Sequence, residues 1–387
     1  MTVSGEVSRP IRLFIVAGEA SGDALGARLI AAMRRLSDRS IEVHGIGGPL
    51  MQAEGLSSLF PMQELAVMGL VEILPHARHL LRRLDETAAD IRAKRPDVIV
   101  TIDAPGFNRR LVDRVKIRSI PRIHYVAPTV WAWRPGRALK FKARFDRLLA
   151  LLPFEPPYFE KVGLDCRFVG HSVLESGADK GDGARFRAEH GLSAETKLLC
   201  LLPGSRRGEV SRLLPAFAEA VHLLGQRRPG LRVAIPVAPG VAPLVEEATA
   251  NWPSPPILVM GEGAKYDCMA GCDAALAASG TVALELALAR APTVVAYRLP
   301  AITYAIVKAL VKVDYVHLLN IMAGRAIVPE CIQSDCVPDR LAAELDRLMG
   351  QAGRDQTEAL APYLAQLWPA GGELPSEAAA RAVLELI

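Results

Sequence analysis

Residues 11–23 of the chain read IRLFIVAGEASGD, an apolar run that ends in glycine and acidic residues. A short run with so few polar residues is typical of a strand buried on both faces of a parallel sheet. Gly18 and Gly22 then predict a turn, and residues 24–36 have the periodicity of a helix. The stretch therefore predicts a strand-turn-helix unit, the repeating unit of a parallel α/β fold.

The same alternation of short apolar runs and helical patterns continues along the chain. A polar, glycine-rich stretch, ESGADKGDG at residues 175–183, is the best candidate for a linker between two such series. The predicted strands are residues 41–46, 98–102, 121–126 and 147–152 before this stretch, and 197–202, 231–236, 257–260, 274–278 and 293–297 after it. We therefore expect two doubly wound parallel-sheet α/β domains that face a cleft, with ligands at the carboxyl ends of the strands.

Length and composition agree with this organisation. The 387 residues suffice for two ordinary domains, which we place at residues 1–175 and 184–345, followed by C-terminal helices at 346–387. Lys and Arg total 46 against 42 Asp and Glu, a net charge of +4 that gives no reason to expect a nucleic-acid partner. No run of about 18 apolar residues predicts a membrane-spanning helix.

Motifs for metals and common cofactors are missing from the sequence. The six cysteines lack the spacing of a zinc site or of a disulfide framework. The P-loop, HExxH and GxGxxG patterns are absent. We therefore expect no bound metal and no cofactor.

Two turns in the second half are suited to phosphate groups. They consist of Gly204, Ser205 and Arg206 after the strand at 197–202, and of Ser279, Gly280 and Thr281 after the strand at 274–278. Backbone N–H groups and the guanidinium of Arg206 can hold a phosphate, and a helix that starts with small residues attracts a diphosphate. Glu285, one turn into that helix, can reach ribose hydroxyls. Together these turns predict a nucleotide-diphosphate site.

The turn after the first strand contains Gly18, Glu19, Ser21 and Gly22. Its glycines allow the backbone to approach a ligand, and the start of the following helix attracts negative charge. The alternative is a structural turn in which Ser21 or Asp23 caps that helix. We keep the four turn residues as candidates for the cleft of the first domain.

Asp103 ends the strand predicted at 98–102 and precedes Ala104 and Pro105. A carboxylate at the tip of a parallel strand is well placed to act as a general base in a cleft. The structural alternative is an Asx turn or a helix cap. His124 lies near the end of the next predicted strand, and Trp133 lies in the loop that follows it. Both can line the same cleft, although aromatic side chains also belong to cores.

The stretch at residues 65–75 is apolar but too short to span a bilayer. It leads into a helix whose start is crowded by Arg78, His79, Arg82 and Arg83. Apolar residues flanked by arginines fit a surface that dips into an anionic membrane leaflet, and the alternative is a core helix with a solvated basic face. The candidate membrane-contact residues are Val67, Met68, Leu70, Val71, Ile73, Leu74, Leu80 and Leu81.

A series of longer motifs carries a family resemblance. In order along nearly the whole chain they are GEASGD (18–23), MQAEG (51–55), ELAVMG (64–69), IDAP (102–105), HYVAP (124–128), VWAW (130–133), LPGSR (202–206), ASGT (278–281) and NIMAGR (320–325). This set resembles the lipid-A-disaccharide synthase family. The resemblance implies a GT-B glycosyltransferase with two Rossmann-like domains, working as a peripheral protein at the cytoplasmic face of the inner membrane.

The resemblance also implies a reaction and roles for single residues. The reaction is an inverting, metal-independent condensation of UDP-2,3-diacylglucosamine with 2,3-diacylglucosamine 1-phosphate (lipid X). Its products are the β(1→6)-linked lipid A disaccharide 1-phosphate and UDP. Asp103 matches the family's essential aspartate and becomes the candidate base, while Arg206, Glu285 and Asn320 match residues of the UDP-sugar site.

One departure and two alternatives accompany the resemblance. Relatives read IDAPDF where this chain has Gly106, so another group must position the acceptor if that second acid does so elsewhere. Family members can form homodimers by exchanging C-terminal segments, and residues 346–387 could do this or pack back on the first domain. The competing interpretations are a UDP-sugar epimerase of GT-B fold and a non-catalytic sugar-nucleotide or lipid binding protein.

Overall fold

The computed structural model describes residues 9–65, 70–278, 280–311 and 313–387. By its contacts the chain divides into two compact units. Unit 1 contains Met1–Ser172 together with Leu367–Ile387, and unit 2 contains Val173–Gln366. The sequence predicts residues 346–387 as one C-terminal group of helices. In the structure this segment is divided between the two units at Leu367.

Unit 1 is built on a seven-stranded sheet in the order β3-β2-β1-β4-β5-β6-β7, with every neighbouring pair parallel. The strand order reverses between β1 and β4, as in a doubly wound Rossmann-like sheet. The strands are β1 (Ile11–Ala17), β2 (Ile41–Ile46), β3 (Ser57–Ser58), β4 (Val98–Ile102), β5 (Arg122–Tyr125), β6 (Arg147–Ala150) and β7 (Asp165–Phe168).

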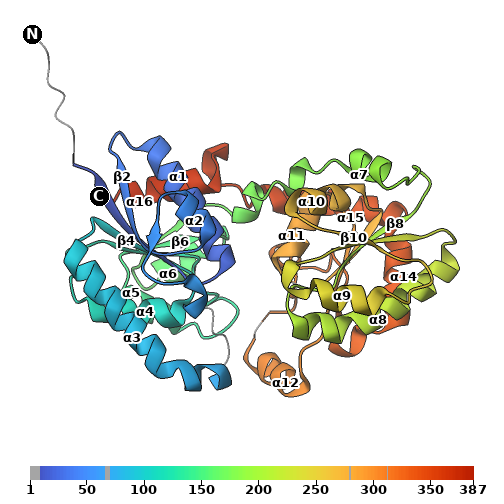
Figure 1. Cartoon of the computed structure of the whole chain (residues 1–387), viewed down its shortest axis with the longest axis horizontal. Coiled ribbons are helices and arrows are strands. Elements are labelled where there is room, and N and C mark those ends of the chain that lie inside the picture. The colour runs from blue at the N-terminus through green and yellow to red at the C-terminus, as the bar shows by residue number, and fades with distance from the viewer. Residues whose placement is uncertain (1–8, 66–69, 279, 312) are drawn as a thin grey trace, which may run out of the picture. The chain divides into compact units, whose positions relative to one another are not determined.

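Helices cover both faces of this sheet. Figure 1 shows α1 and α16 on one side and α3 and α4 on the other. The helices of unit 1 are α1 (Ala20–Leu36), α2 (Pro49–Ala53), α3 (Leu70–Lys94), α4 (Pro105–Val115), α5 (Arg137–Lys142), α6 (Pro156–Glu160) and α16 (Pro375–Leu384). Because both faces are covered, β1 and β4 are buried almost throughout, as their apolar runs predict.

Unit 2 repeats the arrangement with six parallel strands in the order β10-β9-β8-β11-β12-β13. The order reverses between β8 and β11, so the topological switch point occupies the same place as in unit 1. The strands are β8 (Leu198–Leu202), β9 (Arg232–Pro236), β10 (Ile257–Val259), β11 (Ala274–Ala277), β12 (Thr293–Tyr297) and β13 (Glu330–Ile332).

The helices of unit 2 also form two layers. Figure 1 shows α8, α9 and α14 on one side of the sheet and α10 and α11 on the other. The helices are α7 (Gly183–Glu189), α8 (Arg207–Arg227), α9 (Ala242–Thr249), α10 (Glu262–Gly271), α11 (Thr281–Leu288), α12 (Ala301–Leu310), α13 (Leu318–Ala323), α14 (Pro338–Leu348) and α15 (Gln351–Ala365).

The last helix returns to unit 1. Helix α16 packs along α1, and its alanines together with Val383 belong to the first core. Arg147 of β6 donates to the Ala382 carbonyl oxygen at 2.6 Å and pairs with Glu385 at 2.8 Å. Within this chain the C-terminal segment therefore closes one helical layer of unit 1.

The linker expected at residues 175–183 is instead part of unit 2. Ala178 is fully buried, and Asp182 accepts a hydrogen bond from the Arg185 backbone at 2.9 Å, which caps α7. A Cβ atom added to Gly181 would lie 2.2 Å from the Tyr266 carbonyl oxygen. The glycines here permit close packing against α10. A stretch can therefore be rich in glycine because it is tightly packed, and composition alone does not distinguish this case from a linker.

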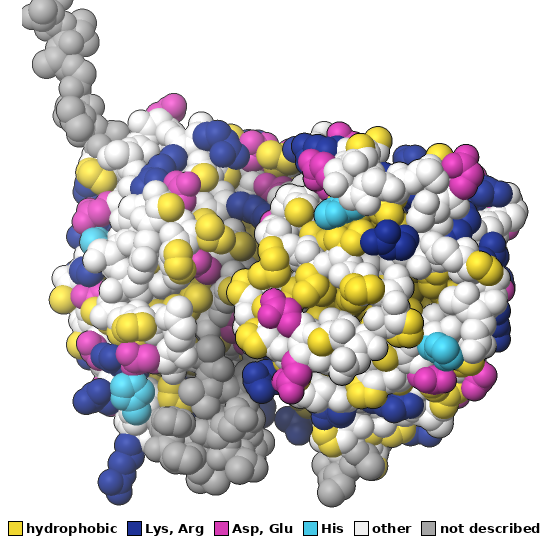
Figure 2. Space-filling view, turned by 45° about the vertical axis from the view of Figure 1, so that its right-hand side comes forward, with side chains coloured by type: hydrophobic (Ala, Val, Ile, Leu, Met, Phe, Trp, Pro, Cys, Tyr) yellow, Lys and Arg dark blue, Asp and Glu magenta, His cyan; other side chains and the backbone are white. Residues whose placement is uncertain are grey.

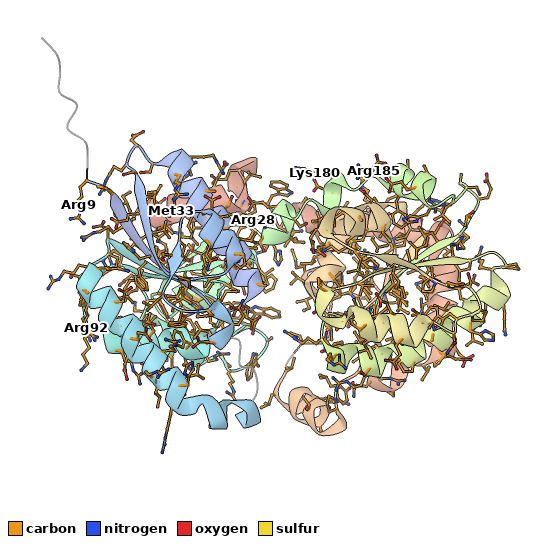
Figure 3. All side chains as sticks on the ribbon, viewed as in Figure 1. Arg9, Arg28, Met33, Arg92, Lys180 and Arg185 are labelled. Atoms are coloured by element: carbon orange, nitrogen blue, oxygen red, sulfur yellow. The ribbon has the colours of Figure 1, made fainter. Side chains whose placement is uncertain are left out.

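The surface carries charges of both signs. Figure 2 shows Lys and Arg interspersed with Asp and Glu over the visible face. In Figure 3, Arg92 points outward from α3, whereas Met33 of α1 is buried in the first core. None of the helices in the described ranges is long and apolar enough to cross a membrane.

Candidate functional site

Unit 2 contains a pocket of about 580 Å³ at the carboxyl ends of β8, β9, β10 and β11. Its position spans the switch point between β8 and β11, where open α/β sheets bind ligands, and its volume is that of a small-molecule site. The lining residues are Leu202, Gly204, Ser205, Arg206, Glu209, Pro236, Val237, Ala238, Pro239, Val259, Gly261, Glu262, Lys265, Ala278, Gly280, Val282 and Glu285.

The structure brings both predicted phosphate turns to this pocket. Gly204 has φ +113° and Gly280 has φ +131°, conformations that side-chain-bearing residues rarely adopt. Each glycine lets a strand turn sharply into a helix, so that the starts of α8 and α11 face the pocket. Thr281 opens α11, and Ser279 lies outside the described residues.

Glu285 is held in the pocket by two partners that the sequence did not reveal. The Lys265 ammonium lies 3.1 Å from one Glu285 carboxylate oxygen, and the Tyr266 hydroxyl donates to the other at 3.1 Å. Both partners are on α10, which follows β10. The sequence around Lys265 forms no recognisable motif. Its contact with Glu285 arises only because the fold brings α10 next to α11.

Arg206 lies at the rim of the pocket, and 67% of its side chain is exposed. Its guanidinium is 3.6 Å from Glu209, which also accepts from the Tyr297 hydroxyl at 3.3 Å. An exposed, weakly paired arginine beside a helix start can turn onto an anionic ligand.

Asn320 has a different environment from the pocket residues. It is fully buried, and its amide nitrogen donates to the Val328 carbonyl oxygen at 2.8 Å and to Glu330 at 2.9 Å. Its amide oxygen accepts from the Ile327 and Val328 backbone N–H groups, both at 2.9 Å. The side chain thus fastens α13 to the segment that enters β13, and it is not among the pocket-lining residues.

In unit 1 the corresponding strand ends are those of β1 and β4. Asp103 follows β4 with φ +45°, and Ala104 follows it with φ +41°. Two successive non-glycine residues in the left-handed region are uncommon and cost about 1–3 kcal/mol each. Asn108 of α4 supports this backbone by donating to the Asp103 carbonyl oxygen at 2.7 Å.

The environment of Asp103 favours its protonated form. Burial raises the pKa of the carboxyl, and a hydrogen bond from the Ala104 backbone opposes this effect. A carboxylate with a raised pKa is a stronger base than one in water. The structure therefore shows a half-buried carboxylate at a strained strand end, and groups with perturbed pKa values in such places are frequent at functional sites.

The turn after β1 lies beside Asp103 and Ala104. A Cβ atom on Gly18 would be 3.2 Å from the Ala104 Cβ, and one on Gly22 would be 3.4 Å from Ile102. These glycines let α1 pack closely against the end of β4. Glu19 is half-buried at the N-cap of α1, and Ser21 is exposed.

The alternative interpretation of this turn was that Ser21 or Asp23 caps the following helix, α1. Asp23 is a cap, but of a different helix. The N-cap residue of α1, Glu19, makes no side-chain capping hydrogen bond to the helix. Asp23 is buried and accepts from the backbone N–H groups of Gly48, Leu50 and Met51 at 2.8–3.0 Å. Asp23 therefore caps α2, which is distant in sequence but adjacent because β2 lies beside β1.

His124 and Trp133 lie in different environments. The His124 ring is buried against Phe141 and Phe145, and its Nδ1 bonds with the Thr101 hydroxyl at 2.8 Å. Burial, followed by the charges of Arg109 and Arg137, lowers the pKa of His124 to about 3. Trp133 is half-buried, and its indole N–H donates to Thr129 at 3.2 Å.

The sequence departure at Gly106 leaves open space. Gly106 is exposed in the first turn of α4, and a Cβ atom added there meets no atom within 4 Å. A larger side chain would therefore fit this position without displacing a neighbour.

The predicted membrane stretch is only partly described. Val67 and Met68 lie outside the described residues, and Leu70, Val71, Ile73 and Leu74 form the first turns of α3. Leu80 is half-buried and Leu81 is 45% exposed, whereas Leu84 further along the helix is buried. Within the part of the chain that the structure describes, no cluster of His, Cys, Asp and Glu could hold a metal ion.

Comparison with known proteins gives a consistent family. Residues 13–365 match the family model described as lipid-A-disaccharide synthetase. A lipid-A-disaccharide synthase of Rhodospirillum centenum is 51% identical over 98% of this chain and 95% of its own length. Another, from Paramagnetospirillum magneticum, is 48% identical over 97% of each chain.

Solved structures agree on the fold. The UDP-GlcNAc 2-epimerase from Neisseria meningitidis bound to UDP-GlcNAc has a TM-score of 0.61 at 12% identity, covering 97% of this chain and 99% of its own. The calicheamicin glycosyltransferase CalG4 has a TM-score of 0.61 at 15% identity, covering 98% of each chain. Both support the predicted GT-B fold class with two parallel-sheet domains.

Proposed function

The chain belongs to the lipid-A-disaccharide synthase family, and from this premise we propose that it joins UDP-2,3-diacylglucosamine to lipid X. The products are the β(1→6)-linked disaccharide 1-phosphate and UDP. The observation that carries the proposal is the pocket at the switch point of unit 2, where both phosphate turns and the half-buried Glu285 converge. The epimerase likeness at 12% identity concerns the fold alone.

In this proposal the pocket of unit 2 binds the donor. The starts of α8 and α11 and the Arg206 guanidinium hold the diphosphate. Glu285, fixed by Lys265 and Tyr266, accepts hydrogen bonds from the ribose hydroxyls. Asn320, which does not line the pocket, acts by holding the segment between α13 and β13.

The chemical step is a single displacement with inversion. Asp103 removes the proton from the acceptor's 6-hydroxyl while that oxygen forms a bond to the anomeric carbon of the donor. The bond from that carbon to the UDP oxygen breaks, and its electron pair leaves with UDP. Arg206 and the start of α11 stabilise the negative charge that grows on the leaving group.

Unit 1 contributes the base and the membrane contact. Gly18, Glu19, Ser21 and Gly22 lie in the turn beside the Asp103 backbone and form the wall on the acceptor side. The apolar stretch at residues 67–81 contacts the surface of the inner membrane from the cytoplasmic side, where the acylated substrates lie. The chain works there as a peripheral protein.

The donor site is tested by UDP affinity in two neighbouring variants. We expect Arg206→Ala to weaken UDP binding about tenfold in titration calorimetry, because a charge-assisted phosphate contact is lost. Arg207→Ala is the matched control, since Arg207 is also exposed but does not line the pocket. Unchanged UDP affinity in Arg206→Ala, or an equal loss in both variants, would contradict the phosphate assignment.

A further inference from the structure

Two arginines of unit 1 lie against Trp133, and a third, Arg109, lies near enough to Arg137 for their charges to interact. The Arg134 guanidinium carbon lies 4.7 Å from the centre of the Trp133 ring, and that of Arg137 lies 5.3 Å from it. Arg109 of α4 donates from its Nε to the Pro105 carbonyl oxygen at 3.1 Å, so its side chain runs back toward the helix start next to Asp103. These three residues form what we call the arginine cluster.

The arginine cluster lacks the partners that neighbouring arginines have. Among the described residues, no carboxylate oxygen lies within 4 Å of its three guanidinium groups. In the same region Arg114 pairs with Asp85 at 2.8 Å, and Arg144 pairs with Asp113 at 2.9 Å. The cluster thus differs from the interspersed charges of the surface in Figure 2.

The arginines of the cluster interact unfavourably with one another. Burial, followed by the charges of Arg109 and Arg134, lowers the pKa of Arg137. The nearby His124 is neutral at physiological pH, because its pKa is lowered to about 3. Positive charges that are held together without a compensating carboxylate are stabilised when an anion binds between them.

We propose that the arginine cluster, Arg109, Arg134 and Arg137, binds the 1-phosphate of the acceptor. Guanidinium groups suit a phosphate monoester, because their planar forks donate pairs of hydrogen bonds. This inference rests on the proposed function, in which lipid X is the acceptor and the donor's phosphates bind in unit 2. It deepens that function by assigning the group that selects a phosphorylated acceptor.

The position of Arg109 on α4, close in the chain to the base, supports this assignment. The acceptor carries its phosphate at C1 and its attacking hydroxyl at C6 of one sugar ring, so both groups must bind within the reach of a single monosaccharide. Arg109 lies on the first turns of α4, the helix that begins two residues after Asp103. A phosphate held here brings the 6-hydroxyl toward the carboxylate of Asp103 and limits its orientation.

The test compares two acceptors in neutral detergent, so that no phospholipid competes. They are lipid X and 2,3-diacylglucosamine without the phosphate. For Arg137→Ala and Arg109→Ala we expect KM for lipid X to rise about ten- to a hundredfold, with KM for the donor unchanged. The same variants should lose most of the preference for the phosphorylated acceptor that the unaltered protein shows.

Arg110→Ala is the matched control, because Arg110 follows Arg109 on α4 and is exposed. It should retain the KM values and the acceptor preference of the unaltered protein. Thermal unfolding followed by circular dichroism separates a binding defect from a folding defect. An unchanged KM for lipid X in folded Arg137→Ala, or an equal loss toward both acceptors, would overturn the proposal.

A binding measurement keeps this test separate from that of the proposed function. Lipid X binding in detergent, measured without donor, should weaken in the cluster variants whether or not the protein turns over. If the unaltered protein binds lipid X through the cluster but forms no disaccharide, the proposed function fails and the phosphate site stands. If the variants lose binding only to phosphatidylglycerol vesicles, the cluster contacts membrane headgroups and the proposal fails.

Discussion

Asp103 is held in its position by the backbone as much as by its side-chain surroundings. Its amide donates to the Tyr125 carbonyl oxygen at 3.0 Å, and Asn108 donates to its carbonyl oxygen. Val126, at the end of the neighbouring strand, is also in the left-handed region with φ +75°. Strain at adjacent strand ends is a feature of sites in which side-chain direction is fixed by the fold.

The raised pKa of Asp103 predicts opposite effects of its removal on stability and on turnover. Burial raises the pKa of Asp103, so its ionised form destabilises the folded protein. This cost is complete at pH values above the pKa in the folded protein, and it disappears at pH values below the ordinary pKa of the unfolded chain. Asp103→Asn should therefore be at least as stable as the unaltered protein at pH 7, and the stability difference should shrink as the pH falls.

Turnover should respond in the other direction. Asp103→Asn should lose about 10²–10⁴-fold in kcat, because a general base is removed. In the unaltered protein, kcat/KM should fall as the pH is lowered through the raised pKa of Asp103. Thermal melts and rates over the same pH series check both effects, and a folded variant with near-normal turnover would rule Asp103 out as the base.

Single residues show where sequence patterns are sufficient and where they are not. The place of Asp103 at a strand tip follows from the apolar run before it, but its left-handed backbone and the support from Asn108 depend on tertiary contacts. Asp23 is a cap, as one alternative predicted, yet it caps a helix that sheet pairing brings alongside. The role of Lys265 likewise depends on the order of strands in the sheet.

Among the secondary-structure elements, the buried strands were predictable because apolar runs define them. β1, β2, β4 and β12 have the predicted bounds, and the other predicted strands differ by one or two residues at an end. The short strands β3, β7 and β13 were missed. Each lies at the edge of its sheet and is only partly buried, so it lacks the continuous apolar run that marks the central strands.

Helix α3 carries the prediction that concerns the membrane. Leu81 is 45% exposed on this helix, so Leu81→Ser should leave thermal stability nearly unchanged while weakening flotation with anionic vesicles severalfold. Leu139→Ser on α5 is the matched control, because Leu139 is 61% exposed in the same unit but lies outside the proposed contact. Equal flotation of the two variants would argue against a membrane contact at α3.

At the scale of the whole molecule, one strand order is used twice. In both sheets the strand order reverses after the third strand. In each unit the candidate ligand groups lie at the carboxyl ends of the strands beside that reversal. Two α/β domains could be predicted from alternating runs and helices. The return of α16 to unit 1 could not, because its alanine-rich face gives no indication of which core it covers.

We propose that unit 2 supplies a donor site, and unit 1 a base, for transfer to an acylated sugar phosphate. The most direct measurement is UDP release from UDP-2,3-diacylglucosamine by the purified protein, with and without lipid X in detergent. We expect UDP release only when lipid X is present, together with an equal amount of a new β(1→6)-linked disaccharide 1-phosphate. UDP release without lipid X, epimerisation of the donor sugar, or binding with no disaccharide would contradict it.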